Sequence, residues 1–163
     1  MKSRLTVLIG LPRAGKSTWA RDYKTSEVVI SADEFRQLMY GQRYYAEGKA
    51  MMWATRDISL KILMQQGVNI IIDETNTTVQ ARAKLLKLAT KYDYYAEAIW
   101  IDATQYMCRV RAAQADQKDL IPIIEKMSDQ LEPPEYSEGF GDICYVGKDP
   151  DLREKYSPLG ESR

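Results

Sequence analysis

Residues 10–17, Gly-Leu-Pro-Arg-Ala-Gly-Lys-Ser, are the stretch of sequence that decides the fold. They match the pattern G-x-x-x-x-G-K-[ST]. They follow an apolar run over 5–9 that predicts a buried strand, and residues 17–23 predict the start of a helix. A strand, a glycine-rich loop and a helix in this order predict a loop that surrounds a polyphosphate with backbone N–H groups and a helix N-terminus. The alternative, a Gly/Pro turn that happens to precede a lysine, does not explain why all three elements occur in the required order.

The side chains of this loop have distinct chemical roles. Lys16 can neutralise the β- and γ-phosphate oxygens of a nucleoside triphosphate, the Ser17 hydroxyl can ligate Mg²⁺, and Thr18 can reach a neighbouring phosphate. We therefore expect ATP or another nucleoside triphosphate as a cofactor, together with Mg²⁺. The residues expected to bind the nucleotide in this loop are Gly10, Arg13, Ala14, Gly15, Lys16, Ser17 and Thr18.

The composition bounds the possible functions. A chain of 163 residues predicts one domain with no second catalytic domain, and 23 basic residues balance 23 acidic ones. This balance argues against a broad nucleic-acid footprint, although a local basic pocket for one or two phosphates is compatible with it. No apolar run approaches the roughly 20 residues that span a bilayer.

The chain contains no histidine, which removes the commonest general base. Any proton acceptor must then be a carboxylate, unless the acceptor group needs little help. Cys108 and Cys144 show no metal-ligand spacing, and the N-terminus does not resemble a signal peptide. We expect a cytoplasmic protein, in the host cytoplasm if it is encoded by a phage.

Strand and helix patterns alternate along the chain. Further strands are expected at 27–30, 68–72, 95–101 and 143–146, and further helices at 34–40, 49–66, 78–92, 104–115 and 121–131. This order predicts an α/β fold: a single P-loop domain over 1–146 with a mostly parallel five-stranded sheet and helices on both faces. Residues 114–119 are expected to form a mobile loop, and residues 147–163 a loosely ordered polar tail.

Two helices are expected to be amphipathic. The apolar face of the helix at 49–66 is expected to comprise Met52, Ile58, Leu60, Ile62, Leu63 and Met64. In the helix at 78–92, the expected solvent-exposed residues are Arg82, Lys84, Lys87 and Lys91.

Polar residues follow each of the first four strands, at the edge of a parallel sheet where ligands bind. Asp33 follows the second strand, residues 73–76 follow the third, and Asp102 follows the fourth. Their convergence predicts a functional site. The alternative is that they are helix caps: Ser31 or Asp33 for the second helix, and Asp102 for the helix that begins near Thr104.

The absence of an N-K-x-D motif disfavours a GTPase, and a motor ATPase would normally be larger. A compact kinase needs a carboxylate to activate the acceptor hydroxyl and cations to hold phosphates. Asp33 is our candidate for that base. Arg36 lies one helical turn further on and could clamp a phosphate. The spacing alone equally allows Asp33 to be a cap and Arg36 a solvated surface residue.

These residues resemble the kinase module of the bacteriophage-type polynucleotide 5′-hydroxyl kinases. The resemblance covers about residues 5–122 and implies that the domain over 1–146 is a single P-loop kinase domain. It rests on G-L-P-R-A-G-K-S-T-W-A-R at 10–21, S-A-D-E-F-R-Q at 31–37, I-I-D-E-T-N at 71–76 and the helix over 102–111. The first motif is shared by many kinases, and the second and third are more specific.

The resemblance implies a role for each matching residue. It implies that Asp33 takes the proton from the acceptor hydroxyl, and that Arg36 holds the phosphate next to that hydroxyl. Lys16 and Arg111 would complete the catalytic set, with Arg111, the first lid arginine, on the donor phosphates. Ser17 would bind the phosphates and Mg²⁺.

The resemblance also implies a role for the residues after the third strand. Asp73 or Glu74 occupies the acidic position, with Asp73 assigned to the metal alongside Ser17. Glu74, Thr75 and Asn76 are assigned to the acceptor side. The substrate implied is a nucleic acid with a free 5′ hydroxyl, either DNA or RNA.

The sequence departs from the family at the second lid arginine, where it has Ala115. Lys118, Arg109 or Arg13 could supply the missing charge, or the donor could be handled differently. The phosphatase half of bifunctional members has no counterpart here.

Three other interpretations remain open. The acceptor could be a hydroxymethylated base in DNA, or it could be a nucleoside or another small metabolite. The chain could instead be a nucleotide-switched binding module or a slow ATPase.

Aromatic residues could stack on bases, although packing is the simpler role for most of them. The candidates are Trp19, Trp53 and Trp100, and the pair Tyr44 and Tyr45 in the loop expected on the acceptor side.

Overall fold

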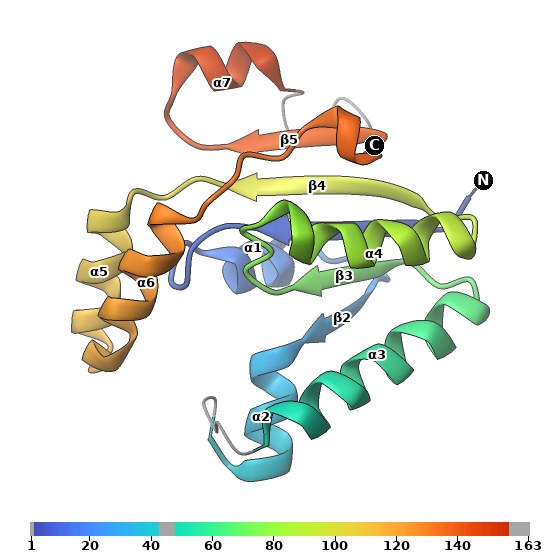
Figure 1. The fold of residues 1–163 in the computed structure, drawn as a ribbon, viewed down its shortest axis with the longest axis horizontal. Coiled ribbons are helices and arrows are strands. Elements are labelled where there is room, and N and C mark those ends of the chain that lie inside the picture. The colour runs from blue at the N-terminus through green and yellow to red at the C-terminus, as the bar shows by residue number, and fades with distance from the viewer. Residues whose placement is uncertain (1, 43–47, 157–163) are drawn as a thin grey trace.

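The computed structural model describes residues 2–42 and 48–156 and confirms the predicted α/β fold (Figure 1). Five parallel strands form one sheet in the order β2-β3-β1-β4-β5. The strands are β1 (Arg4–Ile9), β2 (Val28–Ser31), β3 (Ile70–Asp73), β4 (Tyr95–Ile101) and β5 (Asp142–Val146). The phosphate-binding loop therefore leaves the central strand, with β3 on one side and β4 on the other.

The helices connect these strands and cover both faces of the sheet. They are α1 (Lys16–Tyr23), α2 (Ala32–Tyr40), α3 (Lys49–Gln65), α4 (Val79–Lys91), α5 (Gln105–Gln114), α6 (Ile121–Asp129) and α7 (Pro150–Lys155). Short 3-10 turns form at Lys118–Leu120 and Tyr136–Glu138. Among the described residues, no helix combines the length and the apolar character needed to cross a membrane.

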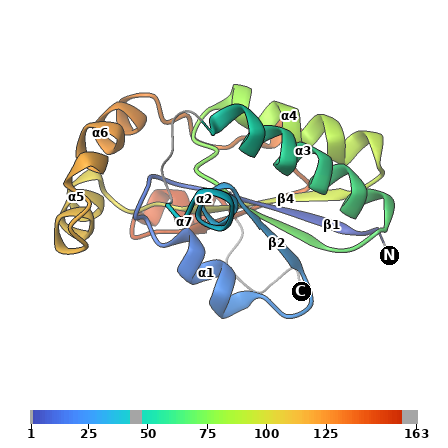
Figure 2. The ribbon, with the colours of Figure 1, turned by 90° about the horizontal axis from the view of Figure 1, so that it is seen from below.

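Two apolar layers hold the helices to the sheet. On one face, Val7 belongs to a buried cluster with Leu60 of α3 and Leu85 of α4. On the other face, Leu8 belongs to a cluster with Trp19 of α1, and α5 and α6 contribute to the same cluster. Figure 2 shows α3 and α4 on the side of the sheet opposite α1. Alternation of neighbouring residues between the two faces explains why β1 and the isoleucines of β3 are buried on both sides.

The carboxyl ends of the strands point toward α5 and α6 (Figure 1). This places the loop after β1, the start of α2 after β2 and the segment after β3 at one edge of the sheet. The parallel register aligns the carboxyl ends of these three strands, because Ser31 of β2 pairs with Asp73 of β3, and Val7 of β1 pairs with Ile72 of β3. The sheet therefore brings together the segments that sequence analysis selected.

Three residues differ from the sequence predictions in their exposure. Arg82 was expected in solvent, but it is completely buried, because Glu138 and the carbonyl groups of Asn76 and Glu132 surround its guanidinium. Ile58 and Ile62 were expected on the apolar face of α3, but they are exposed. The predicted apolar residues Met52, Leu60 and Met64 are buried, and the same stripe, with residues four apart, also contains Arg56.

The segment at 114–119 and the start of the tail are more regular than expected. Residues 118–120 form a 3-10 turn rather than an irregular loop. Residues 150–155 form α7, capped by the Asp149 side chain, and Tyr156 is buried against Trp100. We propose that the domain extends at least to Tyr156, because this ring belongs to the same buried cluster as β1 and α4.

Candidate active site

The loop between β1 and α1 requires glycine at its first position. A Cβ atom at Gly10 would lie 2.5 Å from the carbonyl oxygen of Ile101 in β4. The Gly10 N–H donates to the carbonyl oxygen of Thr75 at 3.0 Å, so this residue is fixed between the ends of β3 and β4. Gly15, with φ of 113°, adopts a conformation that favours glycine just before α1 begins. The loop is thus shaped to bring backbone close to a ligand.

Lys16 lies inside this loop. Its ammonium group donates to the carbonyl oxygens of Gly10 at 3.0 Å and Leu11 at 2.7 Å, and only 8% of the residue is exposed. Burial lowers the pKa of Lys16 to about 8, against the opposing effect of nearby negative groups that include Asp73 and Asp33. Lys16 is therefore a buried cation that would be further stabilised by additional negative charge.

Asp73 and Ser17 meet beside this lysine. Burial raises the pKa of the Asp73 carboxyl group, while a hydrogen bond with the Ser17 side chain and the charge of Lys16 oppose that rise. A hydroxyl and a carboxylate are oxygen ligands that suit Mg²⁺, which usually takes one or two protein carboxylates together with phosphate oxygens. Within 2–42 and 48–156, no group of three or more His, Cys, Asp or Glu residues is placed to hold a metal. The pair fits an ion that is shared with a bound phosphate.

Asp33 and Arg36 form an ion pair on the first turns of α2. Asp33 follows Ser31, which pairs with Asp73 at the carboxyl edge of the sheet, and its carboxylate contributes to the electrostatic environment of both Lys16 and Asp73. The side chain of Asp33 is 60% exposed, whereas that of Arg36 is 17% exposed. The alternative role as helix cap belongs to Ser31, whose Oγ accepts from the Glu34 N–H at 3.4 Å.

Glu74 is held by a residue that the sequence analysis missed. The Arg56 guanidinium donates to both carboxylate oxygens of Glu74, at 2.9 and 2.8 Å, and its third nitrogen donates to Asp57 at 2.6 Å. Although burial would lower the pKa of Arg56, the hydrogen bonds and charges of Glu74 and Asp57 outweigh that effect and raise it. The position of Arg56 on the buried stripe of α3, four residues after Met52 and four before Leu60, was the available signal.

Thr75 and Asn76 position the loop. The carbonyl oxygen of Thr75 accepts from Gly10, and the Asn76 amide donates to the carbonyl oxygen of Leu8 at 2.9 Å. Asn76 is 4% exposed and has a positive φ of 45°, a conformation that asparagine tolerates better than most residues. These contacts join the end of β3 to the end of β1. The predicted contact of Asn76 with an acceptor stays a prediction.

Arg111 extends from α5 to the phosphate-binding loop. Its Nη1 donates to the carbonyl oxygens of Arg13 and Ala14, both at 3.0 Å. Ala115 is the C-cap of α5. Of the three residues proposed to replace the second lid arginine, Arg109 forms an ion pair with Glu125 at 3.3 Å and Lys118 begins a 3-10 turn.

One further residue, Asp102, has a role that differs from its predicted one. Asp102 does not cap α5, since the Thr104 side chain does. Instead, Asp102 accepts a hydrogen bond from the Tyr145 hydroxyl at 2.7 Å, and burial together with this bond raises the pKa of Tyr145 to about 12. Tyr44 and Tyr45 lie outside the described residues.

Comparison with known proteins identifies a family for this chain. The model of the AAA domain family matches residues 5–134. Comparison with curated proteins gives no match.

Several solved structures have a similar fold. Two chains of the Pnkp1/Rnl/Hen1 complex have TM-scores of 0.60 and 0.63 at 24% and 17% identity. They match 68% and 92% of this chain, which spans only 39% and 53% of theirs. The APS kinase CysC of Mycobacterium tuberculosis, solved with AMPPNP and APS, has a TM-score of 0.61 at 14% identity over 94% of this chain and 93% of its own. The chain thus has a fold like that of P-loop kinases.

Proposed function

As the chain belongs to the AAA domain family, we propose that it is a kinase that transfers the γ-phosphate of ATP to a hydroxyl group of a nucleic acid, namely the 5′-hydroxyl end of DNA or RNA. The observation that carries this proposal is the position of Asp33. Its carboxylate acts electrostatically on both Lys16 and Asp73 and is mostly exposed, so an acceptor hydroxyl could approach it next to a bound triphosphate.

The donor side would use the loop and α1. Backbone N–H groups at the start of α1 would bind the phosphates, and Lys16 would exchange its two carbonyl partners for phosphate oxygens. Ser17 and Asp73 would hold Mg²⁺, which when bound neutralises charge on the phosphate oxygens. Arg111 already contacts the loop and would bind a phosphate of the donor there.

The acceptor side would use α2. Asp33 would accept the proton of the attacking hydroxyl, because a carboxylate that is paired with one guanidinium still has lone pairs available. Arg36 would bind the phosphodiester that follows the terminal nucleoside. In a chain of zero net charge, such a contact would recognise one phosphate near the strand end rather than a long stretch of backbone.

The choice of a nucleic acid is in keeping with the likeness to chains of an RNA repair complex. A second candidate is a small-molecule hydroxyl. It is favoured by the likeness to APS kinase, which extends over nearly the full length of both chains, and by the balanced charge. A hydroxymethylated base in duplex DNA is the third acceptor to compare.

Transfer of label from γ-labelled ATP tests these candidates directly. The acceptors are a 5′-hydroxyl oligonucleotide, its 5′-phosphorylated form, a duplex with hydroxymethylated bases and a set of nucleosides. Labelling of the 5′-hydroxyl oligonucleotide alone is the expected result. Labelling of nucleosides or of the modified duplex alone would replace the proposed acceptor. Hydrolysis of ATP with no labelled product would favour a nucleotide-switched module.

A further inference from the structure

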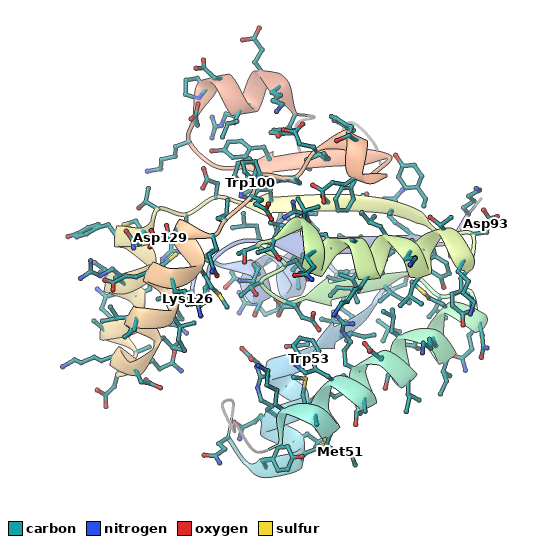
Figure 3. All side chains as sticks on the ribbon, in the orientation of Figure 1. Met51, Trp53, Asp93, Trp100, Lys126 and Asp129 are labelled. Atoms are coloured by element: carbon teal, nitrogen blue, oxygen red, sulfur yellow. The ribbon has the colours of Figure 1, made fainter. Side chains whose placement is uncertain are left out.

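Trp53 differs from the other two tryptophans in its exposure. Trp19 and Trp100 are 5% and 3% exposed and lie in the two apolar layers, whereas Trp53, on the second turn of α3, is 37% exposed. In Figure 3, Trp53 extends from α3 toward the sheet, while Met51 extends from the other side of the helix. An exposed indole that faces the interior side of its helix needs an explanation other than core packing.

One face of the Trp53 ring is supported by Arg56, whose guanidinium carbon lies 5.1 Å from the ring centre. That guanidinium cannot rotate freely, since two of its nitrogens bind Glu74 and the third binds Asp57. A cation over the face of an indole is attracted to its π electrons, more strongly when it is shielded from water. The ring is thus held in one orientation before any ligand arrives.

The same contacts place Trp53 close to the phosphoryl-transfer site. Arg56 binds Glu74, the preceding residue in the chain is Asp73, and Asp73 is hydrogen-bonded to Ser17. The helix α3 also packs against α2, which carries Asp33 and Arg36. Trp53 therefore lies on the helix that packs against α2, the helix that carries the proposed base.

We propose that Trp53 stacks on the nucleobase of the terminal nucleotide of the acceptor strand. The stacking would fix the sugar so that its 5′ hydroxyl lies at Asp33 while Arg36 holds the following phosphate. Stacking of a base on an aromatic side chain tolerates all four bases, because each has a π face. A rigid indole loses little conformational entropy on binding, which favours it over a flexible side chain.

This stacking rests on the proposed function. The experiment therefore compares acceptor oligonucleotides that differ only in whether the terminal base is present. Two 5′-hydroxyl oligonucleotides are used, one with a normal terminal nucleotide and one with an abasic terminal nucleotide. With the normal oligonucleotide, Trp53→Ala is expected to raise the KM roughly tenfold, the size of effect measured for loss of one stacked base. With the abasic one, wild type and Trp53→Ala should have the same KM. Trp53→Phe, which keeps an aromatic face, should retain most of the discrimination.

The matched control is Met51→Ala, two residues away on the other side of α3, which should leave both KM values unchanged. The KM for ATP should not change in any variant. If Trp53→Ala raises the KM equally for the normal and the abasic oligonucleotide, the stacking is overturned while the kinase activity stands.

A binding measurement separates failure of the stacking from failure of the function. The fluorescence of Trp53 is obtained as the difference between wild type and Trp53→Phe, and each oligonucleotide is added in the absence of ATP. Quenching by the normal oligonucleotide and not by the abasic one supports the stacking, even if no phosphate is transferred. Equal responses to the two oligonucleotides, or none, would overturn it.

Discussion

The Arg56 guanidinium and the Glu74 carboxylate form a bidentate ion pair, with hydrogen bonds of 2.9 and 2.8 Å that join α3 to the end of β3. The two side chains are only 9% and 7% exposed. They join the helix that precedes β3 to the segment that follows it, directly beside Asp73. The acidic position after β3 is therefore anchored from the side opposite the phosphate-binding loop.

Arg56→Ala should lower the free energy of unfolding by about 3 kcal/mol, because it leaves the Glu74 carboxylate buried without a partner. Urea unfolding at neutral pH measures the change. The control is Arg21→Ala, whose ion pair with Asp22 is 72% and 51% exposed and which should change stability by no more than about 0.5 kcal/mol. Similar effects of the two substitutions would show that the Arg56–Glu74 pair does not anchor the segment.

The buried Lys16 should make stability depend on pH. Its pKa is about 8 in the folded chain and near 10.5 when unfolded, so between these values the unfolded chain binds more protons and the free energy of unfolding rises with pH. Relative to Lys16→Met, which cannot titrate, the wild type should gain roughly 1–2 kcal/mol between pH 7.5 and pH 9.5. Parallel pH profiles for the two proteins would contradict the burial of the charged group.

Arg111→Ala should reduce kcat more than it weakens ATP binding. The guanidinium contacts the loop carbonyls of Arg13 and Ala14, and a lid arginine acts mainly on charge that develops during transfer. We expect a loss of roughly 100-fold or more in kcat, measured with saturating ATP and acceptor. The control is Arg153→Ala on α7, which removes an exposed arginine that donates a hydrogen bond to the Gly147 carbonyl oxygen, and it should leave kcat unchanged. If Arg111→Ala instead raises only the KM for ATP, the arginine serves ground-state binding.

Much of the fold could be predicted from the sequence because the strands are short, apolar and bounded by polar residues. The run Ile70-Ile71-Ile72 is an example, since burial on both faces leaves a continuous apolar signal. The convergence of Asp33 and Asp73 at one edge also followed from the strand-helix alternation. The order of strands in the sheet could not be obtained this way, because periodicity describes each strand alone.

The buried arginines show where sequence reasoning was wrong or incomplete. Arg82 was assigned to solvent because an arginine on an amphipathic helix usually lies there, and its partner Glu138 is 56 residues away. Arg56 and Glu74 are 18 residues apart and meet only when α3 packs beside β3. In both cases the deciding contact is tertiary. The helical spacing of Arg56 with Met52 and Leu60 could have indicated its burial, because it places a charge on a face that is otherwise buried.

The account depends most on Asp33 as the group that accepts the proton of the attacking hydroxyl. The direct test is single-turnover phosphate transfer to a 5′-hydroxyl oligonucleotide by Asp33→Asn, with the dissociation constant for ATP measured on the same protein. The matched control is Glu34→Gln, which removes the neighbouring carboxylate of α2. We predict that Asp33→Asn lowers the transfer rate by roughly 100-fold or more while ATP affinity and the Glu34→Gln rate stay close to wild type. A transfer rate for Asp33→Asn equal to that of wild type would contradict the account.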